Sequence, residues 1–178
     1  QIKSFQFSVS LAHQYIRDFY DNRCLLSNFI IFAGRNFTTM SRSENIAPFI
    51  IPFAERLKTI DPYIPGLDNY CNTYLAHLLQ HSRYYTEIYA QVLAVFLIHS
   101  EKEKSSVILV DYGAGNGLLG LFAKFCGFKK VYINDINESF IKAATRLSLL
   151  LNIPVDGFIT GDICDVKNYF NAYDRPTA

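Results

Sequence analysis

The stretch VDYGAGNGLL, residues 110–119, places three glycines at alternate positions behind an acidic residue. The acid is Asp111, and the glycines are Gly113, Gly115 and Gly117. Without a Cβ atom, a glycine backbone can approach a ligand closely. Free N–H groups at the start of a following helix would favour an electron-rich ligand. The pattern predicts a ligand-binding loop, with a tight turn that binds nothing as the structural alternative.

This loop should join a buried strand to a helix. Residues 107–110 (VILV) contain no polar side chain, which is typical of a strand buried on both faces of a parallel sheet. After the glycines, leucines and phenylalanines recur at helical spacing up to Cys126 and Gly127, where a glycine suits a helix end. The loop would therefore lie at the carboxyl end of a strand, where open α/β sheets bind ligands.

The spacing of the glycines also indicates which ligand is favoured. A dinucleotide fingerprint, G-x-G-x-x-G, would need its third glycine at position 118, which is Leu118. A nicotinamide-dependent oxidoreductase is therefore the weaker interpretation. The observed acid-x-G-x-G-x-G pattern resembles the first motif of the class I, Rossmann-like S-adenosylmethionine-dependent methyltransferases.

The resemblance continues over about residues 106–166 with two further motifs. Residues 129–133 (KKVYI) are expected to form a second strand, which is followed by Asp135. In the family, an acid at this position accepts both ribose hydroxyls of the methyl donor. Residues 158–163 (FITGDI) resemble the third strand and its exit, where the family commonly places an aspartate against the adenine amino group.

The resemblance implies S-adenosylmethionine as cofactor and a set of donor-binding residues. These are Asp111, Gly113, Ala114, Gly115, Asn116, Gly117, Asp135, Ile136, Asp162 and Ile163. Each acid also has a structural alternative. Asp111 could cap the following turn, and Asp135 with Asn137 could cap the helix that should begin near residue 138. Ligand contact is favoured for Asp111 and Asp135, whereas Asp162 could equally be a solvated loop acid.

An all-helical region is expected before the first strand. Apolar spacing over about residues 67–100 predicts one long helix or two abutting helices. Another helix should open near residues 43–44 and run toward Ile60, with a late start or a kink because of Pro48 and Pro52. Residues 11–20 also look helical, while the periodicity of residues 25–32 leaves their state open.

These patterns predict an α/β fold with two regions. Residues 1–104 should form the helical N-terminal region, and residues 105–178 a Rossmann-like half-domain with a parallel sheet. The polar residues 101–106 would be the hinge between them. The helical region is rich in tyrosine, including Tyr70, Tyr74, Tyr84, Tyr85 and Tyr89. We expect it to cap the carboxyl edge of the sheet and supply part of an acceptor pocket, with ordinary core or dimer packing as the alternative.

Two histidines in the helical region raise the question of a metal. His77 and His81 are four residues apart and would share a helix face, as metal ligands can. The sequence lacks the glutamate of H-E-x-x-H and an obvious third ligand. A partly buried polar pair is therefore the favoured interpretation, and no metal is expected.

The composition restricts the class of protein. The 178 residues are half hydrophobic and carry 17 basic and 16 acidic side chains, a net charge of +1 that disfavours a nucleic-acid partner. Four dispersed cysteines indicate reduced thiols and a cytoplasmic location. The sequence has no apolar run near the roughly 20 residues of a membrane span. No membrane partner is expected, and a homodimer is compatible with these features.

The expected function is S-adenosylmethionine-dependent methyl transfer to an unidentified small molecule or protein. In the family the sheet has seven strands and the fourth pairs beside the first, so we expect the first strand to be an open edge and the chain to be part of a longer protein. Acceptor contacts in the family commonly follow the fourth strand, so no catalytic residue can be named. A nicotinamide-dependent oxidoreductase and a non-catalytic Rossmann-like binding module are the alternatives.

Overall fold

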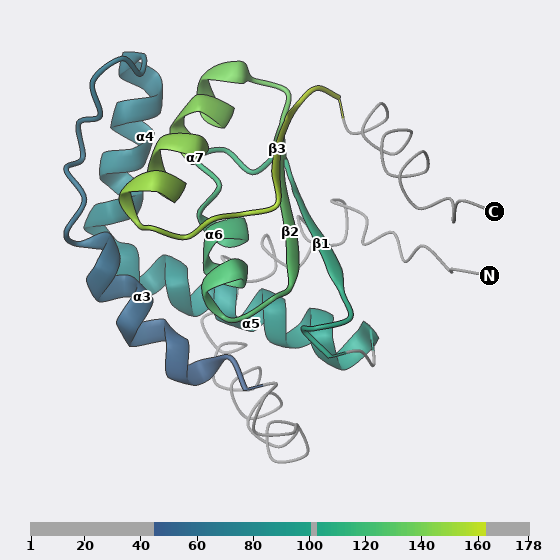
Figure 1. The fold of residues 1–178 in the computed structure, drawn as a ribbon. Helices are drawn as coiled ribbons and strands as arrows, with labels where there is room; N and C mark the ends of the chain where they lie inside the picture. The colour runs from purple at the N-terminus through teal and green to yellow at the C-terminus, as the bar shows by residue number, and fades with distance from the viewer. Residues whose placement is uncertain (1–44, 101–102, 163–178) are drawn as a thin grey trace, which may run out of the picture. The chain divides into compact units, whose positions relative to one another are not determined.

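The computed structural model of the protein describes residues 45–100 and 103–162. They belong to one compact unit that spans residues 44–178. Within the described ranges, helices precede a three-stranded parallel sheet with two connecting helices (Figure 1). The fold is α/β, as predicted, and is consistent with a Rossmann-like half-domain preceded by helices. The expected helix at residues 11–20 and the stretch 25–32 lie outside the described residues.

The helical segment contains a short 3-10 helix, η1 (Ala47–Phe49), followed by α3 (Ile50–Leu57), α4 (Asn69–Gln80) and α5 (Ser82–Ser100). The predicted late helix start is confirmed, because Pro48 lies in η1 and Pro52 lies in the first turn of α3, where a missing N–H costs no helical bond. Of the two arrangements predicted for residues 67–100, two abutting helices are observed. They meet at His81, whose φ of −109° and ψ of 29° depart from helical values.

Helix α4 is anchored at its first turn. The Asp68 carboxylate caps the helix by accepting the N–H of Cys71 at 2.8 Å. The buried Asn72 side chain accepts the N–H of Ile64 at 2.9 Å and donates to the carbonyl oxygen of Leu67 at 3.3 Å. These bonds tie the start of α4 to the loop that precedes it.

The sheet has the order β1-β2-β3, with β1 (Ile108–Tyr112), β2 (Lys130–Asp135) and β3 (Gly157–Thr160) all parallel. Helix α6 (Leu118–Phe125) connects β1 to β2, and α7 (Glu138–Leu150) connects β2 to β3. The second strand thus runs two residues further than predicted and includes Asp135. All three carboxyl ends lie at one edge of the sheet.

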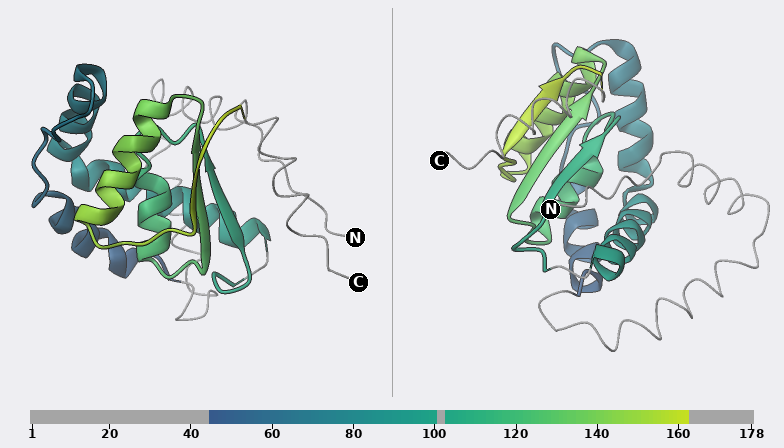
Figure 2. Two further views of the ribbon diagram at one scale, coloured as in Figure 1. Left: turned by 45° about the horizontal axis from the view of Figure 1, so that its top comes forward. Right: turned by 90° about the vertical axis from the view of Figure 1, so that its right-hand side faces the viewer.

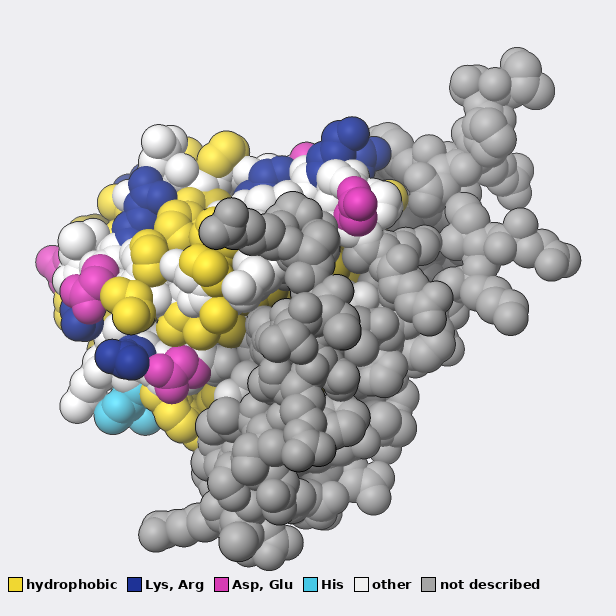
Figure 3. All heavy atoms as spheres, turned by 90° about the horizontal axis from the view of Figure 1, so that it is seen from below, with side chains coloured by type: hydrophobic (Ala, Val, Ile, Leu, Met, Phe, Trp, Pro, Cys, Tyr) yellow, Lys and Arg dark blue, Asp and Glu magenta, His cyan; other side chains and the backbone are white. Residues whose placement is uncertain are grey.

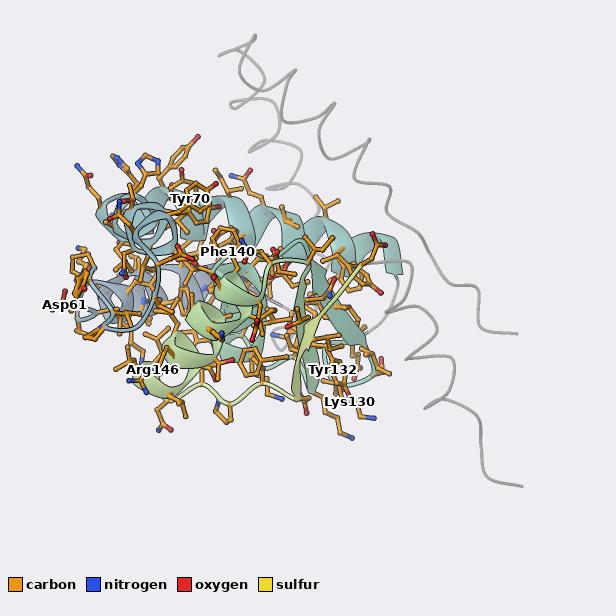
Figure 4. The ribbon with its side chains drawn as sticks, turned by 90° about the horizontal axis from the view of Figure 1, so that it is seen from above. Asp61, Tyr70, Lys130, Tyr132, Phe140 and Arg146 are labelled. Carbon is orange, nitrogen blue, oxygen red and sulfur yellow. The ribbon has the colours of Figure 1, made fainter. Side chains whose placement is uncertain are left out.

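The described helices lie on one face of the sheet (Figure 1, Figure 2). Leu109, Val131 and Ile133 are buried. Along β1 the alternate residue Ile108 is 39% exposed, and Lys130 and Tyr132 of β2 point away from the helices (Figure 4). The prediction that the first strand is buried on both faces is therefore wrong for the described part of the chain, because α3 to α7 cover the same side. Within that part, β1 is an edge strand, as predicted.

Aromatic packing joins the helical segment to α6. The ring centroid of Phe53 in α3 lies 5.0 Å from that of Phe122 and 5.4 Å from that of Phe125, both in α6. Lys104 lies in the segment predicted to be a hinge, and the hinge itself stays a prediction. Lys104 is buried, its Nζ lies 5.4 Å from the centroid of the Phe49 ring, and its carbonyl oxygen accepts a backbone N–H bond. Residues 101–102 lie outside the described residues.

Candidate functional site

The glycine loop, residues 113–117, joins the carboxyl end of β1 to α6. Gly113, Gly115 and Gly117 all have left-handed backbone, with φ of 62°, 54° and 73°. Residues with a Cβ atom rarely adopt this conformation. The Ala114 N–H donates to the Asn134 carbonyl oxygen at 3.0 Å, which fastens the loop to the end of β2. The backbone path itself therefore requires the glycines, so that the turn alternative accounts for part of the pattern.

The three glycines differ in what surrounds them. A Cβ atom at Gly117 would lie 2.8 Å from the Cβ of Ala144, so this glycine permits α7 to pack closely. A Cβ atom at Gly115 would lie 3.1 Å from Cε1 of Tyr74, whereas one at Gly113 would meet nothing within 4 Å. The loop is thus packed at its third glycine, covered by an aromatic ring at its second, and open at its first.

Asp111 is buried beneath the loop and acts as a helix cap. Its Oδ2 accepts the N–H of Gly120 at 2.9 Å, in the first turn of α6. Burial raises the pKa of this carboxyl to about 7, the Gly120 hydrogen bond opposes that rise, and the Asp135 charge adds to it. The capping alternative is therefore confirmed for Asp111, and a ligand contact remains a prediction.

Asp135 joins the end of β2 to the glycine loop. Its Oδ2 accepts the N–H of Gly115 at 2.8 Å, and its Oδ1 accepts the N–H of Asn137 at 2.8 Å. Asn137 in turn caps α7 by accepting the N–H of Ser139 at 2.9 Å. The predicted acid of the second strand and the predicted loop are thus in direct contact, and the capping role foreseen for the pair is confirmed at Asn137.

Asn116, a residue of the loop, is fully buried on the side that faces α4. Its Nδ2 lies 3.5 Å from the carbonyl oxygen of Cys71. Its Oδ1 is buried without a hydrogen-bond partner among the described residues. A buried, unsatisfied acceptor costs free energy, so this oxygen marks a place where a hydrogen-bond donor would be stabilised.

Three of the remaining predicted residues are exposed or partly exposed. Ala114 is partly exposed, Ile136 is 71% exposed beside Asp135, and Asp162 is exposed after β3. The N–H of Gly161 donates to the Asp135 carbonyl oxygen at 3.1 Å, which brings the exit of β3 next to the end of β2. Ile163 lies outside the described residues.

The Tyr74 side chain of α4 lies against the loop at Gly115. Besides its contact at Gly115, the Tyr74 ring packs edge to face on Phe140 of α7, with centroids 5.7 Å apart. Tyr85 stacks on Tyr89 at 6.4 Å. Burial raises the pKa of the Tyr74 and Tyr89 phenols, so both keep their hydroxyl protons at neutral pH. The expected packing of this region at the carboxyl edge is observed for α4, and its part in an acceptor pocket stays a prediction.

Two residues of this neighbourhood were missed by the sequence analysis. Phe140 was not singled out, although it lies in the first turn of the helix predicted to begin near residue 138, three residues after the Asn137 cap. Asn134 donates to the carbonyl oxygens of Ile159 at 2.9 Å and Gly161 at 3.0 Å, and so holds the ends of β2 and β3 together. A polar residue next to a strand-ending aspartate was the available signal for Asn134.

The histidine pair differs from its prediction. His77 and His81 have ring centroids 5.0 Å apart, but both side chains are exposed rather than partly buried. The reason is that their shared helix face points to solvent, where the His77 Nε2 lies 3.0 Å from the hydroxyl of Tyr85. In residues 45–100 and 103–162, no group of three or more His, Cys, Asp or Glu side chains is placed to hold a metal ion.

The described cysteines are free and buried. Burial raises the pKa of the Cys71 thiol to about 11 and that of the Cys126 thiol to about 12. Both therefore remain protonated and poorly nucleophilic at neutral pH.

Surface features agree with the balanced composition. Figure 3 shows charged side chains of both signs scattered among hydrophobic ones on the described part of one face. Among the described helices, none is long and apolar enough to cross a membrane.

Comparison with known proteins finds a partial similarity to methyltransferases. Over 54 residues the chain is 41% identical to the ribosomal protein L11 methyltransferases of Acinetobacter baumannii strains AYE, SDF and AB0057. The match covers 30% of this chain and 18% of each relative, so the chain spans a small part of their length. No family model and no solved structure matches the chain. The similarity supports methyl transfer in general and leaves the acceptor unspecified.

Proposed function

We propose that this chain is the donor-binding part of an S-adenosylmethionine-dependent methyltransferase. The observation that carries the proposal is the hydrogen bond of 2.8 Å between the Gly115 N–H and the Asp135 carboxylate. It brings the glycine loop and the acid of the second strand together at the carboxyl edge of the sheet, where α/β folds bind ligands. The partial similarity to named methyltransferases supports the same reaction class.

The residues present fit such a ligand. A carboxylate offers about four lone-pair sites, and Asp135 uses two of them on backbone N–H groups, which leaves capacity for ribose hydroxyls. The buried Asn116 Oδ1 has no hydrogen-bond partner among the described residues and could accept a hydrogen bond from the ligand. At Gly113 the space where a Cβ atom would lie is open. The exposed Ile136 supplies an apolar surface beside Asp135. Asp162 would complete the site at the exit of β3.

When bound, S-adenosylmethionine supplies a methyl group that its sulfonium centre has already activated. The contribution of the chain is to bind and orient the donor and to exclude water. Asp111, Asp135 and the loop would hold the donor, while Tyr74 covers the second glycine. We propose a small molecule or a protein as acceptor rather than nucleic acid. The name of the similar proteins designates a ribosomal protein, which agrees with the second of these classes.

Two other functions predict different binding. A nicotinamide-dependent oxidoreductase would bind NAD, but the position of its third fingerprint glycine is occupied by Leu118, which is 1% exposed. A non-catalytic module would bind a ligand without transferring anything. Isothermal titration calorimetry of the whole chain with S-adenosylmethionine, S-adenosylhomocysteine and NAD distinguishes a methyltransferase from an oxidoreductase. Methyl-transfer assays of a longer protein that includes this chain distinguish a methyltransferase from a non-catalytic module.

The Asp135→Ala variant tests the donor site directly. Loss of charge-assisted contacts to the donor should weaken binding by about 1.5 to 3 kcal/mol, roughly 10- to 150-fold. Glu138→Ala is the matched control, because Glu138 is an exposed acid three residues away that pairs with Lys142 at 3.1 Å. Equal affinity in wild type and a folded Asp135→Ala variant would exclude the proposed role of this acid.

A further inference from the structure

Phe140, in the first turn of α7, lies where α7 packs against α4. Its ring centroid is 5.7 Å from those of Tyr70 and Tyr74 in α4, and both pairs are edge to face. Figure 4 shows Phe140 beside Tyr70 between α7 and α4. The Phe140 N–H donates to the Asn137 carbonyl oxygen at 3.1 Å, and the Asn137 N–H donates to Asp135 at 2.8 Å.

Tyr74 carries this contact on to the glycine loop. Its Cε1 lies 3.1 Å, and its hydroxyl oxygen 3.7 Å, from the place where a Cβ atom on Gly115 would be. The Gly115 N–H is itself bonded to Asp135. The contacts therefore run in a closed series through Phe140, Tyr74, Gly115, Asp135 and the Asn137 cap. A displaced Phe140 ring would alter the position of Tyr74 against the loop.

We propose that Phe140 is a positioning residue of the donor site, which holds the Tyr74 ring over Gly115 and thereby tunes the affinity for the donor. This inference rests on the proposed function, because the affinity concerned is that for S-adenosylmethionine. Phe140 acts through Tyr74, and Tyr74 is the residue that faces the loop.

The geometry of the rings explains why an aromatic residue is needed. In an edge-to-face pair, the positive edge of one ring meets the negative face of the other, which fixes their relative orientation. A leucine at position 140 would fill much of the same space without that preference. The Phe140→Leu variant should therefore leave the packing of α4 on α7 largely intact and release the Tyr74 ring, whereas Phe140→Tyr should retain the pair.

If Phe140 only stabilised the fold, its effect on affinity would not depend on Tyr74. A double-mutant cycle distinguishes this structural role from the positioning role. The dissociation constants of S-adenosylmethionine and S-adenosylhomocysteine are measured by calorimetry on the whole chain as wild type, Phe140→Leu, Tyr74→Leu and the double variant. Phe140→Leu alone should weaken binding by about three- to tenfold. In the Tyr74→Leu background the same change should have no further effect, since the residue through which it acts is absent. Phe140→Tyr should restore wild-type affinity.

Phe96→Leu provides a control for the general loss of an aromatic pair. Phe96 of α5 pairs with Phe128 at a centroid distance of 6.5 Å, and neither belongs to the candidate site. This variant should lower Tm without changing the dissociation constants. Wild-type affinity in Phe140→Leu, or independent and additive losses in the double variant, would overturn the positioning role alone. A wild-type chain that binds neither ligand would overturn the proposed function together with this inference.

Discussion

At the scale of single residues, the site is built from acids that also hold the backbone together. Asp111 bonds to Gly120, and Asp135 bonds to Gly115 and Asn137. Each carboxylate would serve both the fold and the ligand. Substitutions at these acids must therefore be judged by stability and affinity together.

The buried Asp111 should make the stability of the chain depend on pH. Its pKa is about 7 in the folded chain and 3.8 in the reference state, so the folded chain keeps a proton that the unfolded chain releases between these values. The free energy of unfolding should therefore fall as pH rises from about 4 to 7. Asp111→Asn keeps an acceptor for the Gly120 N–H and removes this titration.

Urea denaturation of wild type and Asp111→Asn between pH 4 and 8 measures the effect. The stability of the variant relative to wild type should increase across this window by a few kcal/mol, because each pKa unit corresponds to about 1.4 kcal/mol. Parallel stability curves for the two proteins would show that Asp111 ionises normally.

Two glycines of the loop allow a matched comparison of backbone strain and ring contact. Gly113→Ala and Gly115→Ala both place a Cβ atom on left-handed backbone, and each should cost about 1 kcal/mol of stability. The added Cβ meets Tyr74 at 3.1 Å in Gly115→Ala and open space in Gly113→Ala. Only the Gly115→Ala substitution should therefore disturb the Tyr74 ring that covers the loop.

Hydrogen exchange of the α4 amides, measured by mass spectrometry, reads out that difference. Exchange in residues 69–80 should be faster in Gly115→Ala than in Gly113→Ala, with similar Tm values for the two variants. The same exchange rate of α4 in both variants would show that Tyr74 accommodates the extra atom without loosening the helix.

At the scale of elements, we expect α4 and the start of α5 to act as a movable cover over the carboxyl edge of the sheet. Helix α4 touches the loop and α7 through side chains near its centre, and its outer face carries the exposed His77 and His81. A cover of this kind should open for ligand exchange and close over the bound donor.

Donor binding should therefore protect α4 and the first turns of α5 from hydrogen exchange. We expect slower exchange at residues 70–89 when S-adenosylmethionine is added, because closure suppresses local opening of these helices. Helix α3 is the internal reference, since Phe53 packs it against α6 away from the loop. Equal exchange of residues 70–89 with and without ligand would indicate that the helices are a scaffold or a dimerisation element.

At the scale of the whole molecule, all described elements belong to one compact unit. This unit spans residues 44–178 and includes both the helical segment and the sheet. A fragment of residues 44–178 should therefore unfold in one cooperative transition and bind S-adenosylmethionine as the whole chain does. Circular dichroism melts and calorimetry of the fragment check both points, and a loss of affinity in a folded fragment would place part of the site in residues 1–43.

Several features followed from the sequence because they depend on neighbouring residues. The glycines permit a tight loop, the prolines delay α3, the apolar spacing marks α4 to α6, and a cap at Asp135 and Asn137 marks the start of α7. The order of strand, loop and helix from residue 107 onward follows from such local patterns. The boundaries of β1 and β2 shifted by one or two residues, since the ends of strands depend on their partners.

The contacts that make a site were decided by tertiary structure. The bond between Asp135 and Gly115 joins residues 20 positions apart, and the contact of Tyr74 with Gly115 joins two different layers of the fold. Sequence periodicity cannot tell which side chain of an amphipathic helix meets which loop, because this depends on how the helices pack. The burial that raises the pKa of Asp111 and the exposed face of β1 have the same origin, since each depends on which elements cover the sheet.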